Sequence, residues 1–161
     1  SKILRAAAAS EARKGMGTTV VALQYRDNAA YWAHVGDSRL YLLRKGALRR
    51  LTRDHSFVQD LVDRGSITEE EARNHPKKNL LTRAVGVEEK LVVDTGSFTI
   101  EAGDIFLLCS DGLTNMVGEA AIRETLQGES ADKARTLVEL ALLAGGLDNI
   151  TAIVVECDER G

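Results

Sequence analysis

The hydrophobic pattern of the chain is that of short strands whose ends carry acidic turn residues. Residues 105–109 are five consecutive apolar residues, and Ser110-Asp111-Gly112 follows them directly. An apolar run bounded by turn residues predicts a strand that is buried on both faces. Near the C-terminus, Leu147-Asp148-Asn149 leads into a second apolar run at residues 150–155. The pattern therefore places a carboxylate at the end of two buried strands.

Further strands are predicted upstream of these two. Alternating or β-branched segments separated by turn residues occur at residues 18–25, 30–35, 39–44 and 47–51. Four such segments in close succession favour an antiparallel meander. Strand character returns at residues 80–86 and 92–100.

Helical periodicity replaces the strand pattern in two regions. Apolar residues from Phe57 to Val62 share one helical face, and Thr68 with Glu71 forms a capping box for a second short helix before Pro76. Two further helices are predicted at residues 119–127 and 131–144, and the alanine-rich residues 3–14 resemble the end of another. Strands and helices are segregated along the chain, so the predicted fold class is α+β.

Composition narrows the class of protein. The chain has 161 residues, 44% of them apolar and 28% charged, with a single proline, which indicates one compact domain over residues 1–161. The net charge of −3, without an extended basic run, argues against nucleic acid or an anionic membrane as partner. Because no apolar run has membrane-spanning length and no signal peptide is recognisable, we expect a cytoplasmic location. Cys109 and Cys157 lie in apolar runs and are expected to be buried free thiols.

Three aspartates share one local setting, a turn at the end of a predicted strand. They are Asp37 in Val-Gly-Asp-Ser-Arg, Asp111 in Cys-Ser-Asp-Gly-Leu and Asp148 in Leu-Asp-Asn-Ile. Taken singly, each is most simply a turn residue. If the three converge to about 4 Å, each pair repels by about 4 kcal/mol at an effective dielectric constant near 20, so a cation is needed. Magnesium or manganese, which take oxygen ligands, is the expected partner.

Other polar residues are weaker candidates for chemistry. His75 is a speculative proton donor to a leaving group, whereas His34 is expected to be a packed or surface residue of a strand. Arg39 and Arg83 are expected to pair with nearby carboxylates rather than to bind substrate.

Six segments in this order resemble successive motifs of the metal-dependent type 2C serine/threonine protein phosphatases in their bacterial form. The segments are residues 15–19, 35–39, 51–56, 79–86, 108–113 and 148–151. The resemblance implies a sandwich of two mostly antiparallel β-sheets flanked by helices, with residues 54–80 as a helical flap insertion. It also implies hydrolysis of phosphoserine and phosphothreonine in proteins by a water activated between two Mg²⁺ or Mn²⁺ ions.

The resemblance assigns roles residue by residue. Asp111 and Asp148 would be ligands of the catalytic metal pair, and Asp37 with Asp111 would form a weaker third site. The implied partners are a phosphoprotein substrate and the opposing Ser/Thr kinase of a signal-transduction pathway.

The chain departs from the family at its start. Family members carry, upstream of the motif at residues 15–19, a first strand with an arginine that grips phosphate and an Asp-Gly-x-Gly-Gly turn whose aspartate bridges both metals; neither motif occurs before Gly15 here. We therefore expect the chain to be the C-terminal two-thirds of the domain, inactive in isolation, with the missing N-terminal segment as a non-covalent partner. The alternatives are a non-catalytic binding or regulatory module and a relative that dephosphorylates an anti-sigma antagonist.

Overall fold

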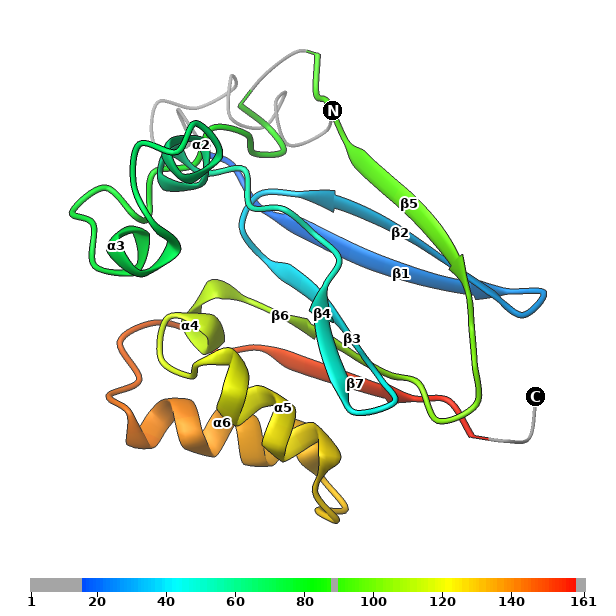
Figure 1. Ribbon diagram of the computed structural model, residues 1–161. Helices are drawn as coiled ribbons and strands as arrows, with labels where there is room; N and C mark the ends of the chain where they lie inside the picture. The colour runs from blue at the N-terminus through cyan, green and yellow to red at the C-terminus, as the bar shows by residue number, and fades with distance from the viewer. Residues whose placement is uncertain (1–15, 88–89, 159–161) are drawn as a thin grey trace.

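The computed structural model describes residues 16–87 and 90–158, which form two antiparallel sheets (Figure 1). The three-stranded sheet has the order β1 (Val20–Arg26), β2 (Ala29–Val35), β5 (Asp94–Thr99). The four-stranded sheet has the order β4 (Ala47–Arg50), β3 (Arg39–Arg44), β6 (Ile105–Cys109), β7 (Ala152–Glu156). Every neighbouring pair is antiparallel. The predicted sandwich of two antiparallel sheets is confirmed, whereas the helix expected at residues 3–14 lies outside the described residues.

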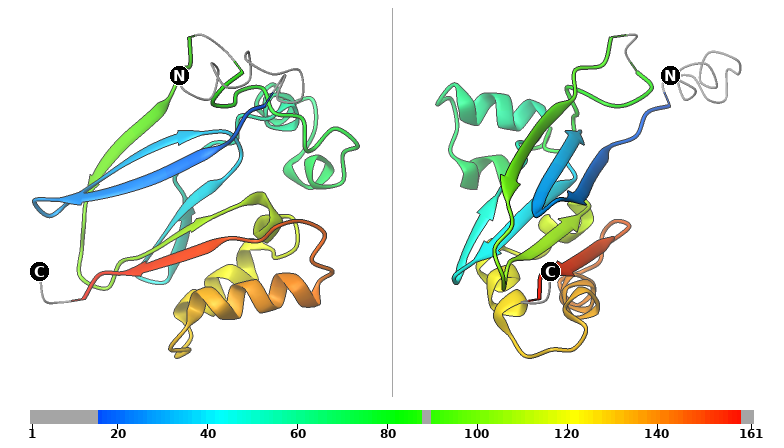
Figure 2. Two further views of the ribbon diagram at one scale, coloured as in Figure 1. Left: turned by 180° about the vertical axis from the view of Figure 1, so that it is seen from behind. Right: turned by 90° about the vertical axis from the view of Figure 1, so that its right-hand side faces the viewer.

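Helices occupy two places in the molecule. Between β4 and β5 the chain forms α2 (Phe57–Asp63) and α3 (Glu69–Arg73), which lie beyond one end of the sandwich. Between β6 and β7 it forms α4 (Asp111–Thr114), α5 (Glu119–Gln127) and α6 (Lys133–Leu143). Helices α5 and α6 cover the outer face of the four-stranded sheet, as the views in Figure 2 show. None of the helices in the described ranges has the length and apolar character needed to cross a membrane.

Strand β6 explains why the molecule has two apolar cores. Phe106 and Leu108 point between the sheets, where they pack with Leu40 and other residues of the inter-sheet core. Leu107 and Cys109 point the other way, into the core formed with α5 and α6. Successive side chains of a strand face opposite sides, so an unbroken apolar run is what a doubly buried strand requires.

Two sequence-based predictions of secondary structure are wrong. The first four strands do not form one meander, because the chain crosses from one sheet to the other between β2 and β3, at residues 36–38. Residues 80–86 do not form a strand; they make only isolated bridges, Leu81 with Ser56 and Val85 with Thr18. Their backbone bonds instead close the segment that carries α2 and α3.

Several local predictions stand. The capping box at Thr68 and Glu71 is present at the start of α3. Of the two settings expected for His34, packed or at the surface, the structure has the packed one, with no exposed surface. Cys109 is a buried free thiol as expected, but Cys157 is only half-buried.

Candidate metal centre

Asp111 lies where β6 gives way to α4. Ser110 is the N-cap residue, so the Asp111 carboxylate belongs to the first turn of a short helix rather than to a simple strand end. The side-chain amide of Asn115 donates a hydrogen bond to Asp111 Oδ2 at 3.3 Å. Helix α4 was not predicted, because four residues provide no apolar periodicity that distinguishes a helix from a turn.

The start of α4 is held against the loop that precedes β7. Ser110 Oγ donates to the carbonyl oxygen of Asn149 at 3.2 Å and accepts from the Thr151 amide at 3.0 Å. The Ser110 amide also donates to the Thr151 carbonyl oxygen at 3.1 Å. These bonds join residues about 40 positions apart and place the Asp111 and Asp148 segments side by side.

Asp37 faces the same space from the crossing between the two sheets. Asp37 and Asp111 both line a cavity of about 410 Å³. Residues of α3 and α5 complete its wall, among them Glu69, Arg73 and Glu119. The predicted flap therefore forms one side of the cavity that contains two of the candidate ligands.

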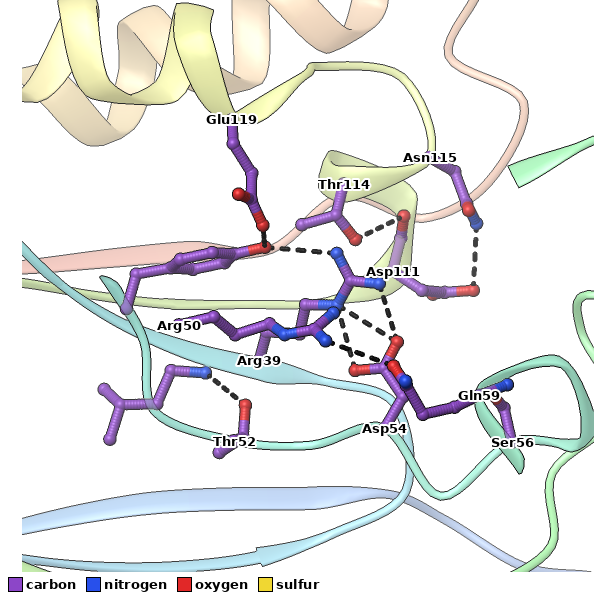
Figure 3. Close-up of polar contacts among 12 residues, drawn as sticks. Arg39, Arg50, Thr52, Asp54, Ser56, Gln59, Asp111, Thr114, Asn115 and Glu119 are labelled. Atoms are coloured by element: carbon purple, nitrogen blue, oxygen red, sulfur yellow. Dashed lines mark hydrogen bonds and ion pairs between the residues drawn. The ribbon is translucent and has the colours of Figure 1, made fainter. Parts of the chain in front are cut away.

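Arg39 compensates the charge of these carboxylates only in part. Arg39 Nε lies 2.9 Å from Asp54 Oδ1, and Arg39 Nη2 lies 2.6 Å from Asp54 Oδ2, so the guanidinium is bound in a bidentate ion pair (Figure 3). Its remaining nitrogen, Nη1, donates to the hydroxyl of Tyr41 at 3.1 Å, and that hydroxyl donates to Glu119 Oε1. The expected pairing of Arg39 with a carboxylate is confirmed.

The pKa values of Asp37 and Asp111 reflect this incomplete compensation. Burial, then the charges of Asp111 and Asp54, raise the pKa of Asp37 to about 6. Burial and the charge of Asp148 likewise raise the pKa of Asp111. Oxygen ligands with uncompensated negative charge suit a hard divalent cation.

A different group of side chains has its possible metal ligands close together. Within the part of the chain that the structure describes, His34, His55 and Asp94 form the one group of three whose candidate ligand atoms all lie within 4.8 Å of one another. The ligand atoms of the three aspartates are not all this close. The sequence analysis missed this group, because its members are far apart in the chain and share no spacing typical of ligands.

The hydrogen bonds of His55 argue against a metal in this group. Its Nδ1 accepts a hydrogen bond from the Gly36 amide at 3.1 Å, so the ring proton of the neutral imidazole is on Nε2. Nε2 lies 3.1 Å from Asp94 Oδ2 and donates to it, which leaves no lone pair for an ion. Arg83 Nη1 binds the other oxygen of Asp94 at 3.0 Å, as expected for an ion-paired arginine. The hydrogen bond from His55 is the main cause that lowers the pKa of Asp94.

His75 lies apart from the aspartates. It follows α3, its Nδ1 accepts a hydrogen bond from the Lys77 amide at 3.1 Å, and its ring centroid is 6.1 Å from that of Phe57. It is not among the residues that line the cavity of Asp37 and Asp111.

Comparison with known proteins places the chain in a family. The family model described as Protein phosphatase 2C matches residues 2–61. The solved structure of the serine/threonine phosphatase PstP/Ppp from Mycobacterium tuberculosis superposes with a TM-score of 0.92 at 42% identity, covering 99% of this chain and 68% of that one. The chain belongs to the type 2C family of metal-dependent protein phosphatases, in its bacterial form.

Other proteins named as protein phosphatases match over most of the chain. The protein phosphatase PhpP of Streptococcus pneumoniae is 46% identical over 152 residues, which are 93% of this chain and 62% of PhpP. The serine/threonine phosphatase stp of Listeria monocytogenes is 49% identical over 146 residues, 89% of this chain and 58% of stp. The chain thus spans about three-fifths of the length of these curated relatives. A catalytic domain of PstP solved in complex with two manganese ions matches with a TM-score of 0.87 at 42% identity, covering 96% of this chain and 64% of that one.

Proposed function

We propose that the protein containing this chain hydrolyses phosphoserine and phosphothreonine in other proteins at a two-metal centre. The observation that carries the proposal is the docking of the Ser110 segment on the loop after Asp148, beside a cavity lined by Asp37 and Asp111. The relatives named as serine/threonine phosphatases support the reaction, and the PstP complex with manganese supports metal dependence.

The chain contributes ligands from two loops and from the first turn of α4. Asp111 and Asp148 would hold one ion of the catalytic pair, and Asp37 with Asp111 would hold a weaker third. Bound Mg²⁺ or Mn²⁺ supplies an activated water and neutralises charge that develops on the phosphoryl group. The Asn115 amide orients the Asp111 carboxylate, while Asp54 keeps Arg39 from competing for it.

Residues of the cavity wall would receive the substrate. Arg50, Arg73 and Lys78 line it together with the acidic residues, so both signs of charge face a bound phosphopeptide. The segment at residues 54–80 forms part of this wall, and we propose that it acts as a flap that influences which phosphoproteins enter. A phosphoprotein, an opposing kinase, a signalling role and a cytoplasmic location follow from this proposal.

A further segment of the protein would complete the site. The chain spans 62% of PhpP. In the edge strand β7, Ile153 and Val155 lie opposite Leu108 and Phe106 on the face between the sheets, yet they are 53% and 40% exposed. An additional segment packed on that face would cover them, and an additional strand would pair with the free edge of β7. We propose that the segment that covers it brings the remaining metal ligands, and that the 161-residue chain alone has little or no activity.

The experiment measures manganese-dependent hydrolysis of a phosphothreonine peptide by the complete protein. Asp111→Asn and Asp148→Asn are each expected to lower kcat/KM by about 100-fold or more, since second-shell changes alone cost about 10–100-fold at metal sites. Asp132→Asn is the matched control, because Asp132 caps α6 away from the cavity and asparagine caps equally well. Absence of turnover in the wild-type protein would favour the binding-module alternative, and full activity of Asp111→Asn would refute the assigned site.

The isolated chain is assayed in parallel. It is expected to be inactive with excess manganese and to gain turnover when a separately produced upstream segment is added. Robust turnover by the chain alone, with its mass confirmed, would show that its own residues suffice.

A further inference from the structure

The loop that carries Asp37 is held by the residues that lead into α2. The Leu40 amide donates to Thr52 Oγ1 at 3.0 Å, and Arg39 is paired with Asp54. The next residue, His55, makes two hydrogen bonds with Gly36, the residue immediately before Asp37. Residues 52–55, where the proposed flap begins, therefore bond to the Asp37 loop both before and after Asp37.

The contact between His55 and Gly36 is reciprocal. The His55 amide donates to the Gly36 carbonyl oxygen at 2.7 Å, and the Gly36 amide donates to His55 Nδ1 at 3.1 Å. Gly36 has φ of +111°, and an added Cβ would come within 2.3 Å of Thr19 Cγ2. The backbone here has no freedom to shift toward Thr19, so the bonds to His55 define the position of the peptide that precedes Asp37.

The opposite side of the His55 ring is fixed as well. Nε2 lies 3.1 Å from Asp94 Oδ2, and Arg83 Nη1, which binds the other oxygen of that carboxylate, also lies 3.1 Å from Nε2. The Gly36 amide can only donate, so Nδ1 accepts and the neutral ring carries its proton on Nε2, which donates it to Asp94 rather than accepting from Arg83. The buried ring of His34 packs against that of His55 with a centroid distance of 4.7 Å, which restricts ring rotation.

We propose that His55 is a positioning residue for Asp37. It fixes the Asp37 carboxylate through the Gly36 peptide, and Asp94 with Arg83 fixes the tautomer and orientation of His55. This inference rests on the proposed function, in that Asp37 is taken to be a metal ligand of the weaker site.

The same residue joins the two ends of the proposed flap. The Thr82 amide donates to the His55 carbonyl oxygen at 2.9 Å, and the Phe57 amide donates to that of Leu80 at 2.9 Å. The two ends of the segment are therefore hydrogen-bonded to each other at His55, the residue that also bonds to Gly36. A movement of α2 and α3 would be transmitted to the Asp37 loop through His55.

Two substitutions separate the two sides of the imidazole. In His55→Asn the amide oxygen can take the place of Nδ1 and accept from Gly36, but the bond to Asp94 is lost. In His55→Gln the longer side chain can reach Asp94 in place of Nε2, but it leaves the Gly36 amide without its acceptor. If His55 served stability alone, the two variants would have the same manganese affinity. If it positions Asp37, their manganese affinities differ.

The primary measurement is a calorimetric manganese titration of the complete protein, with Asp37→Asn defining the loss of the weaker site. His55→Gln is expected to weaken that site by about 10-fold or more, as outer-shell substitutions do, and His55→Asn is expected to restore most of the affinity. Asp104→Asn is the control, because it removes a buried ion pair far from Asp37 and should leave the titration unchanged. Wild-type affinity in His55→Gln, or equal losses in both variants, would overturn the proposal.

A second measurement needs neither turnover nor metal. Exchange of the Gly36 amide hydrogen, followed by NMR, is expected to be slow in the wild type and in His55→Asn and faster in His55→Gln. Unchanged Gly36 protection in His55→Gln would overturn the proposal even where the phosphatase assignment holds. If Asp37→Asn leaves the titration unaltered, Asp37 is not a ligand, and the metal assignment fails instead.

Discussion

Gly112 and the carbonyl oxygen of Asn149 lie so close together that no side chain fits between them. A Cβ added to Gly112 would stand 2.3 Å from Asn149 O and 3.0 Å from its carbonyl carbon. Both partners are backbone atoms, so neither can move aside as a flexible side chain would. This approach sets how near α4, with Asp111, stands to the loop that carries Asp148.

Gly112→Ala should consequently open the candidate metal centre. The alanine methyl group must push the two loops apart, so we expect weaker manganese binding and a loss of about 1–3 kcal/mol in unfolding free energy, as for overpacked cores. Calorimetric titration and denaturant unfolding measure the two effects. Gly128→Ala is the matched control, since Gly128 does not line the cavity, its φ is −68°, and an added Cβ there would come no closer than 3.4 Å to another atom. A Gly112→Ala variant with wild-type manganese affinity would show that the approach is not needed.

Asp37→Ala tests whether the site of Asp37 binds metal more weakly than the site of Asp111 and Asp148. Asp37 lines the cavity together with Asp111 but takes no part in the bonds that join Ser110 to residues 149–151. We expect slower turnover, unchanged thermal stability with metal bound, and retention of the tight manganese sites. Loss of the tightest site in the calorimetric titration would contradict the weaker role given to Asp37.

The ion pair between Arg44 and Asp104 should make stability depend on pH. Arg44 Nη2 lies 2.6 Å from Asp104 Oδ2, and the carboxylate is 1% exposed. Burial alone would raise the pKa of Asp104, but hydrogen bonds from Arg44 and from the Glu101 amide outweigh it, so the pKa is lowered. A lowered pKa means that the stabilisation is complete above the unfolded-state pKa and is lost as pH falls through the folded-state pKa.

Asp104→Asn is accordingly expected to destabilise the protein at neutral pH by about 2–3 kcal/mol. This is less than the 3–5 kcal/mol typical of a broken buried pair, because Arg44 is partly exposed and keeps Glu101 as a partner. The difference in unfolding free energy between the variant and the wild type should begin to shrink as pH falls below about 4, the usual pKa of an aspartate. It should vanish once pH falls below the lowered pKa of folded Asp104, because the wild-type carboxyl is then neutral as well. Urea unfolding at several pH values measures it, and a difference that grows on acidification would contradict the assigned sign.

The proposed flap should open more readily than the sheets. Helix α3 has no buried residue, and α2 buries only Val58 and Gln59. Few buried contacts imply a low free energy of local opening, so we expect faster amide exchange in α2 and α3 than in β6. Helix α5 is the control for a short helix, since it buries Ile122 and Leu126 completely and should be protected. Equal protection of α3 and β6 would argue against a flap.

Local features of the fold were predictable from the sequence because their causes are local. The apolar run of β6 requires burial on both faces, and the bond pattern of Thr68 with Glu71 involves residues three apart. Helix α5 spans Glu119–Gln127, the range that its apolar spacing predicts. In each case a few neighbouring residues determine the result.

Features that depend on distant partners were not predictable. Gly36 marks a turn in the sequence, but nothing nearby tells whether the chain returns to the same sheet or crosses to the other. Residues 80–86 have a strand-like sequence, yet only two of them make bridges. Leu81 pairs with Ser56, and Val85 pairs with Thr18. The contact of His55 with Asp94 joins positions 39 apart, and only the folded sheets bring them together.

The crossing at residues 36–38 also bears on the order in which the molecule folds. Strands β1 and β2 pair across a short turn, as do β3 and β4, so each hairpin can form early and independently of the other. The Asp37 loop lies at the junction of the two hairpins, and Asp111 and Asp148 arrive only when β6 joins β3 and β7 joins β6. We therefore expect a destabilising substitution at this late-formed junction, such as Gly112→Ala, to speed unfolding while leaving the refolding rate almost unchanged.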